Sequence, residues 1–301
     1  MIYRIRHTTR YDYRVPVDYG VHLAHLIPRP LPGQRVIAAA VETMPALSWR
    51  HDGVDHFGNA VAWLFLDTPH ASFEATMRAL VEVAFAPPPE AWATPPWEAV
   101  AAAAWRGGAG AWQAAEFVFD SPLAAADPGA RAYAAASFSP GRPMLVALLD
   151  LIGRIRAEFT FRAGVTTTAT PIAEVLRRRE GVCQDFTHLM ISALRGLGLP
   201  ARYVSGYIRT RPPPGQARRL GADQSHAWVD AWLGVEHGWV GLDPTNGLIV
   251  HDEHVVLAWG RDYDDIAPLR GVILGGGEQS LTVEVELEDA SPSANPAAAP
   301  A

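Results

Sequence analysis

The sequence predicts an α+β protein in which an antiparallel β domain precedes a unit that combines helices with a second sheet. Two patterns support this fold class. Short apolar runs with a period near two, separated by prolines and glycines, fill about the first 85 residues, whereas a helical stripe after Cys183 is followed by alternating segments typical of strands. The length of 301 residues exceeds the roughly 100–200 residues usual for one domain, so we expect two units.

The N-terminal antiparallel β domain is expected at residues 1–87. Its predicted strands are Ile2–Arg14, Arg35–Thr43, Val61–Asp67 and Phe73–Phe85. The run Pro87–Pro89 ends the domain, because three prolines cannot continue the hydrogen-bond ladder of a sheet.

A helical connecting region is expected at residues 88–144, which are rich in alanine and interrupted by glycine and proline. The segment Met144–Glu158 predicts a longer helix, since its apolar residues recur at helical spacing. We expect the second unit at residues 145–288, ending in a strand or hairpin at Gly271–Glu288. A disordered tail of proline, alanine and serine is expected at 289–301.

Composition excludes several functions. The net charge of −7 argues against a nucleic-acid partner, which would select a basic surface. All 25 basic residues are arginine, so no lysine can act as a base, form a Schiff base or accept an acyl group within the chain. The single cysteine excludes an internal disulfide and a multi-thiolate zinc site. No stretch approaches the roughly 20 apolar residues of a membrane helix, and we expect a cytoplasmic location.

Cys183 is the first candidate for chemistry. It precedes an apolar stripe at intervals of three and four, which predicts a helix with Cys183 in its first turn and an end near Gly196, Gly198 and Pro200. At a helix start, free N–H groups and the helix dipole favour a thiolate and can hold an oxyanion. Gly181 would allow a substrate backbone to approach. Taken alone, Cys183 also suits a buried core position.

His226 and Asp243 are the second and third candidates. Ser225–Leu233 alternates as a strand, and a four-residue turn after Trp232 would place His226 opposite Asp243 on the next strand. Asp243 would then fix the tautomer of His226, whose other ring nitrogen could take the thiol proton. Considered singly, His226 could instead be a half-buried histidine that is hydrogen-bonded within a sheet. Asp243 could instead be a turn residue that precedes a proline.

These residues stand in motifs that resemble the bacterial transglutaminase-like superfamily, a relative of papain-type cysteine peptidases. The N-terminal part is similar to the β domain often found ahead of that core. The motifs are Gly181–Met190, Gly198–Tyr207, Ser225–Val229 and Gly238–Gly247 in the second unit, and Tyr3–Ile5, His7–Thr9, Pro28–Pro30 and Phe57–Asn59 in the first. The resemblance implies a papain/transglutaminase-like core, with the nucleophile on a helix and the His/Asp pair on a sheet. It also implies thioester chemistry on amides.

The sequence therefore predicts a cysteine-dependent acyl-transfer enzyme with Cys183 as nucleophile, His226 as base and Asp243 as the residue that orients the base. The expected substrate is a protein or peptide, attacked at a peptide, isopeptide or glutamine amide bond. Hydrolysis is favoured over transamidation, because nothing in the sequence indicates a second channel for an amine. Gln184 and Trp228 are candidates for oxyanion or substrate contacts, and we expect no cofactor and no metal.

Two other classes of function are weighed against this one. Metal-dependent hydrolysis could use the available histidines, but no HExxH or comparable spacing appears. The histidines considered are His188, His226, His237, His251 and His254. A binding scaffold with a vestigial site is the other alternative, and the presence of all three candidate residues argues against it.

Overall fold

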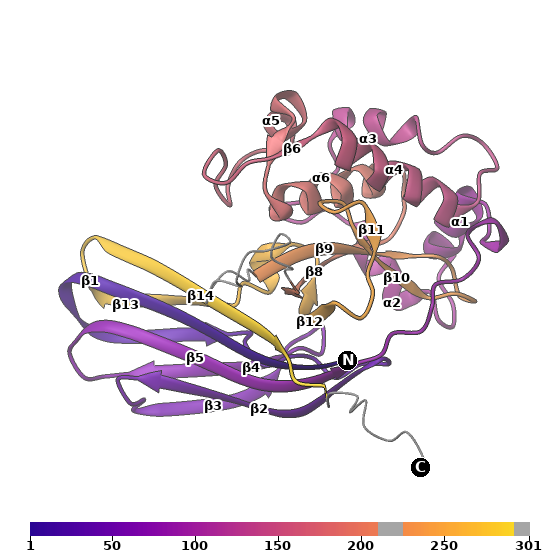
Figure 1. Ribbon diagram of the computed structural model, residues 1–301. Coiled ribbons are helices and arrows are strands. Elements are labelled where there is room, and N and C mark those ends of the chain that lie inside the picture. The colour runs from indigo at the N-terminus through magenta and orange to yellow at the C-terminus, as the bar shows by residue number, and fades with distance from the viewer. Residues whose placement is uncertain (210–224, 292–301) are drawn as a thin grey trace, which may run out of the picture.

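The computed structural model describes residues 1–209 and 225–291 and confirms the predicted α+β class. A large antiparallel sheet, a smaller antiparallel sheet and a group of helices follow one another as three layers (Figure 1). The sequence also predicts a polar loop at 211–224, rich in proline, glycine and arginine. This loop and residues 292–301 of the predicted tail lie outside the described residues. None of the helices in the described part of the chain has the length and apolar character needed to cross a membrane.

The large sheet is organised around β1, a strand of 23 residues. Strands β4 and β5 follow one another along one side of β1, and β3 and β2 pair with them at the edges. β1 continues past Pro16 because that proline lies where the ladder with β5 is interrupted, between Asp12 and Val17. The strands are β1 Ile2–Ala24, β2 Gln34–Met44, β3 Trp49–Val54, β4 Ala60–Leu66 and β5 His70–Val83.

The C-terminal strands differ from the expectation that residues 145–288 form one unit. β13 (Leu269–Gly275) and β14 (Gln279–Asp289) pair with β1 and complete the large sheet. Gly275–Gly277, all with positive φ, connect these two strands as they follow β1. Alternation along a strand identifies its faces but not its partner, so the sequence pattern did not reveal this pairing.

The helical layer is formed by the alanine-rich region and the residues up to Gly196. Helix α4 has the predicted limits, Met144–Glu158, and α6 has Cys183 in its first turn as expected. The helices are η1 Ala91–Ala93, α1 Trp97–Arg106, α2 Trp112–Ala115, η2 Glu116–Val118, α3 Pro128–Ala135, α4 Met144–Glu158, α5 Ile172–Arg178 and α6 Cys183–Gly196. A two-residue parallel pair, β6 (Thr160–Phe161) and β7 (Glu180–Gly181), lies before α6.

The smaller sheet, called the core sheet below, has the order β11-β10-β9-β8-β12. Its residues Ala227, Val229 and Ala231 belong to the same apolar core as the buried stripe of α6. Residues of β8 and β12, including Tyr207 and Val255, instead join the apolar core of the large sheet. The strands are β8 Ala201–Ile208, β9 Ser225–Trp232, β10 Trp239–Asp243, β11 Leu248–Ile249 and β12 His254–Gly260, and η3 (Tyr263–Asp265) follows.

Two buried amides join the large sheet to the edge of the core sheet. Gln34 donates to the Val256 carbonyl and accepts from the Val256 N–H, both at 2.7 Å. Asn59 does the same for the Trp259 carbonyl and N–H, at 2.8 and 3.0 Å. Each amide therefore replaces one residue of a neighbouring strand, which satisfies backbone groups of β12 that the core sheet leaves unpaired.

Candidate active site

The start of α6 is fixed by a buried carboxylate. Asp185 accepts hydrogen bonds from the Val182 N–H and the Thr166 hydroxyl, both at 2.7 Å. Burial raises the pKa of Asp185 above its usual range, against the effect of these two bonds. A Cβ on Gly181 would lie 2.7 Å from the Asp185 carboxylate. The cap therefore requires a glycine at position 181. The sequence had suggested a different role for Gly181, the close approach of a substrate backbone.

Cys183 is partly exposed at the first position of α6. Its side chain packs against the edge of the apolar core but is not enclosed by it. A partly exposed cysteine at a helix start lies next to backbone N–H groups that point out of the helix.

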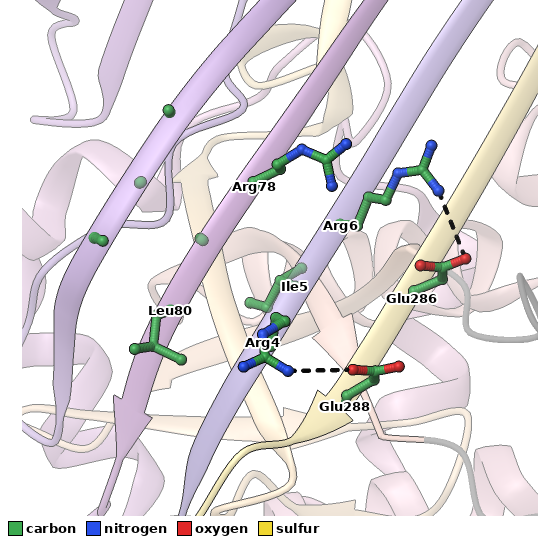
Figure 2. A pocket seen from close by; sticks show the side chains of 11 residues that line it. Arg4, Ile5, Arg6, Arg78, Leu80, Glu286 and Glu288 are labelled. Atoms are coloured by element: carbon green, nitrogen blue, oxygen red, sulfur yellow. Dashed lines mark ion pairs between the residues drawn. The ribbon is translucent and has the colours of Figure 1, made fainter.

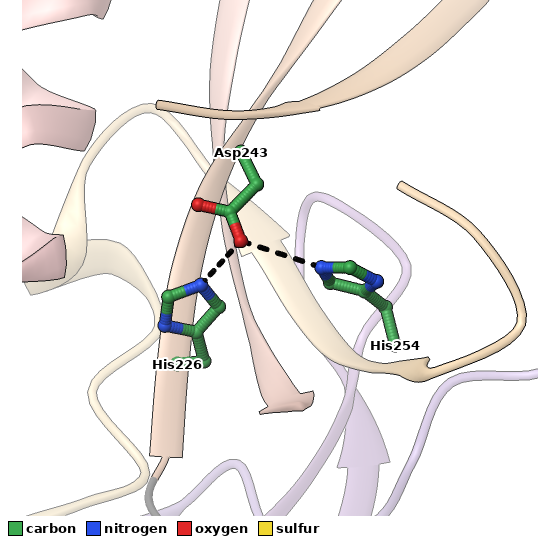
Figure 3. A group of neighbouring side chains, drawn as sticks. All are labelled: His226, Asp243 and His254. Atoms are coloured by element: carbon green, nitrogen blue, oxygen red, sulfur yellow. Dashed lines mark hydrogen bonds and ion pairs between the residues drawn. The ribbon is translucent and has the colours of Figure 1, made fainter. Parts of the chain in front are cut away.

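His226 and Asp243 are in direct contact, although the predicted register is wrong. The His226 Nε2 lies 2.7 Å from the Asp243 Oδ2 (Figure 3). Trp232 pairs with Trp239 across a six-residue connection, rather than with His237. Asp243 is therefore displaced by two residues from the position opposite His226. Because a two-residue offset keeps side chains on the same face, the two still meet as diagonal neighbours.

Cys183 lies close enough to the ring of His226 to raise the pKa of the imidazole, so the three candidate residues come together. Since Nε2 faces Asp243, the other ring nitrogen, Nδ1, is the one left for the thiol. Burial lowers the pKa of His226, but the hydrogen bonds and charges of Asp243 and Cys183 outweigh burial and raise this pKa from 6.5 to about 10. The arrangement stabilises an imidazolium between a carboxylate and the sulfur.

Asp243 is fully buried and accepts five hydrogen bonds. Its Oδ1 accepts from the backbone N–H groups of Thr245 and Asn246, at 2.9 and 3.1 Å. Its Oδ2 accepts from the Asn246 side chain at 2.7 Å, from His226, and from His254 at 3.4 Å. Burial raises the pKa of Asp243, but these bonds prevail and hold it well below its usual range. Asp243 is thus ionised and fixed in place.

His254 and Tyr203 are two neighbours that sequence reasoning did not assign to the site. His254, at the start of β12, is fully buried and lies beside Asp243 (Figure 3). Tyr203, on β8, is buried, and both burial and the nearby charge of Cys183 raise its pKa well above the usual value. The only sequence signal for Tyr203 was its place in the motif Gly198–Tyr207. The only signal for His254 was that it is one more histidine, close to Asp252 in the sequence.

The other two site candidates lie in different surroundings. Gln184 follows Cys183 on α6 and is partly exposed. Trp228 is fully buried next to the rings of His226 and His254, with ring centres 6.2 and 5.3 Å away. Within the described part of the chain its indole N–H has no hydrogen-bond partner. Trp228 therefore walls the two histidines from water.

His226, Asp243 and His254 are also the one group of three potential metal ligands among residues 1–209 and 225–291. Both histidines direct Nε2 at the same Asp243 oxygen, and each bond needs a proton between the two atoms. A metal would have to replace both protons. His188 instead accepts from the Tyr263 N–H, and His237 and His251 lie outside the group. The residues fit a hydrogen-bonded relay better than a metal centre.

Two hollows of the surface lie apart from Cys183. One of about 480 Å³ covers the face of the large sheet turned away from the core sheet, where Arg4 and Arg6 pair with Glu288 and Glu286 at 3.6 and 3.8 Å (Figure 2). The other, of about 550 Å³, is lined by Trp228 and by Arg202, which stacks between two tryptophan rings. Neither hollow is lined by Cys183, His226 or Asp243.

A helix-borne thiol facing a His–Asp pair on an antiparallel sheet defines a fold of the papain and transglutaminase type. Residues 3–82 match the family model of the bacterial transglutaminase-like N-terminal region, and residues 131–244 match that of the transglutaminase-like superfamily. The chain belongs to this transglutaminase-like superfamily.

Its relatives cover nearly the whole chain. The uncharacterized protein Rv2569c of Mycobacterium tuberculosis is 41% identical over 286 residues, which span 93% of this chain and 90% of that protein. The uncharacterized protein ML0607 of Mycobacterium leprae is 32% identical, over 94% of this chain and 97% of its own. The crystal structure of a proposed cysteine protease from Cytophaga hutchinsonii has the same fold, with a TM-score of 0.73 at 20% identity over 96% of this chain and 90% of that one.

Proposed function

We propose that this protein is a cysteine-dependent acyl-transfer enzyme that cleaves amide bonds through a thioester. The observation that carries the proposal is the His226–Asp243 hydrogen bond, with the partly exposed Cys183 near the same imidazole at the start of α6. A merely structural cysteine would gain nothing from a buried, charge-stabilised imidazole beside it.

In the proposed mechanism, the Cys183 sulfur attacks the amide carbonyl carbon while its proton resides on His226. The first N–H groups of α6 and the Gln184 amide are the proposed donors that stabilise the oxyanion. The proton on His226 then passes to the departing amine, the carbon–nitrogen bond breaks, and a thioester is left on Cys183. A water molecule gives a proton to His226 and attacks the thioester. The acid departs, and the proton returns to the thiol. Asp243 stabilises the imidazolium in each half-reaction.

The proposed substrate is a protein or peptide with a peptide, isopeptide or glutamine carboxamide bond, and water is the proposed acceptor. Transamidation to an amine is the alternative outcome for the same thioester. Because the chain contains no lysine, any lysine-linked product must take its amine from another molecule. This makes the two outcomes separable without self-crosslinking of the enzyme through its own lysines.

The test uses the purified protein with peptides that carry an internal amide, an isopeptide or a glutamine. Products are identified by mass spectrometry with and without a primary amine. We expect the acid product from at least one substrate, and no product from Cys183→Ala. An amine adduct that replaces the acid would favour transamidation. Equal product from wild type and Cys183→Ala would refute the proposal, and binding of peptides without any turnover would favour a non-catalytic scaffold.

A further inference from the structure

His254 is attached to the proposed site from the far edge of the core sheet. It opens β12, which pairs with β8, whereas His226 and Asp243 lie on β9 and β10. Its side chain is fully buried, and its Nε2 lies 3.4 Å from the Asp243 Oδ2 that also meets His226 (Figure 3). Of the five hydrogen bonds to Asp243, three come from the turn that follows β10 and one from β9, so His254 supplies the one from β12.

The tautomer of His254 follows from its second contact. The backbone N–H of His251 donates to the His254 Nδ1 at 3.4 Å. A backbone N–H can only donate, so Nδ1 carries no proton and a neutral ring must carry its proton on Nε2. That proton points at the Asp243 carboxylate. The titratable groups that face His254 are Asp243, His226 and His251, and the edge of Trp228 closes another side.

The neutral state of His254 is supported by its surroundings. Burial lowers the pKa of His254, and the charges of His226 and His251 lower it further, against the effect of Asp243. The two histidines on Asp243 therefore differ. The pKa of His226 is raised, which favours its charged form, whereas the pKa of His254 is lowered, which favours a neutral ring that can serve as a hydrogen-bond donor.

We propose that His254 is a positioning residue for the proposed reaction, a neutral Nε2–H donor that holds the Asp243 Oδ2 in line with His226. This inference rests on the proposed function for its effect on turnover. A single neutral donor on a carboxylate contributes modestly, so its loss should slow turnover by about tenfold rather than abolish it. His254 does not touch the reacting atoms in this arrangement.

The first experiment needs no substrate. Nitrogen-15 NMR of histidine side chains, assigned with His254→Gln, is expected to show His254 neutral with its proton on Nε2 from about pH 5.5 to about pH 8, a range in which an ordinary histidine titrates. A proton on Nδ1, or conversion to imidazolium in that range, would overturn the proposal. This readout stands even if no amide is ever cleaved, so failure of the proposed function can be told from failure of the inference.

The second experiment compares His254→Leu with His254→Gln, because the glutamine amide nitrogen can occupy the place of Nε2 and leucine cannot donate. The rate of Cys183 alkylation by iodoacetamide is measured against pH, along with turnover and thermal unfolding. We expect turnover and the alkylation rate at neutral pH to fall in the leucine variant and to recover in the glutamine variant. The exposed His56→Leu serves as the matched control. No fall in either rate, or no recovery with glutamine in a folded protein, would contradict a positioning role.

Discussion

Replacing Asp243 by asparagine tests the electrostatic basis of the site. The pKa of His226 is raised from 6.5 to about 10, a change of roughly 5 kcal/mol in favour of the imidazolium. Asp243 and Cys183 share this effect, and the Asp243 hydrogen bond is the larger of the raising contributions. Asparagine keeps the shape but loses the charge, so we expect it to remove about 2.5–5 kcal/mol. That corresponds to a rate loss on the order of 10²- to 10⁴-fold.

Two measurements decide the outcome for Asp243→Asn. One is kcat/KM on the amide substrate, and the other is the pKa of His226 followed by NMR, which we expect to fall toward 6.5. The exposed Asp264→Asn is the control for a generic loss of charge. The reasoning is refuted if the folded Asp243→Asn variant keeps activity within about threefold of wild type or leaves the pKa of His226 near 10.

Three further predictions concern the thiol, acid stability and the contact between sheets. The rate of Cys183 alkylation below about pH 7 should fall roughly tenfold in His226→Ala, since the imidazolium is proposed to stabilise the thiolate. An unchanged rate would contradict an interaction between Cys183 and His226. Burial lowers the pKa of His7 to about 4, so the unfolded chain binds a proton first as pH drops below 6.5. The free energy of unfolding should therefore decline from pH 6.5 toward pH 4, by about 2 kcal/mol at pH 5. When this free energy is measured by urea unfolding at several pH values, it should fall less steeply with decreasing pH in His7→Gln. Asn59→Ala leaves a buried N–H and C=O of Trp259 unpaired and should lower the free energy of unfolding by about 2–4 kcal/mol, whereas the exposed Gln113→Ala should not.

The elements with a strong local period could be predicted from the sequence. The limits of α4 and the first turn of α6 follow from apolar spacing and from stop signals within the segments themselves. β3 was not predicted, because it is an edge strand with exposed, polar residues and no alternation. The partner of β14 could not be predicted either, since pairing depends on which edge of β1 is left open in the folded chain.

In the candidate site, too, local features could be predicted from the sequence and contacts between distant segments could not. Cys183, His226 and Asp243 could each be chosen from the local setting, a helix start, a strand and a turn before proline. The exact pairing of His226 with Asp243 was beyond the sequence, because the length of the connecting turn sets the register. His254 was missed for a stronger reason. Its bond to Asp243 depends on β12 lying next to β8, which no local pattern encodes.

The position of β12 links the large sheet to the candidate site. His254 begins this strand beside Asp243, and Trp259 lies near its other end, where Asn59 binds both of its backbone groups. Between them, Gln34 binds both backbone groups of Val256. An edge strand without such partners would be free to shift or fray. Because amides from the large sheet occupy the outer edge of β12, the same contacts that join the two sheets also fix the backbone that carries His254 to Asp243.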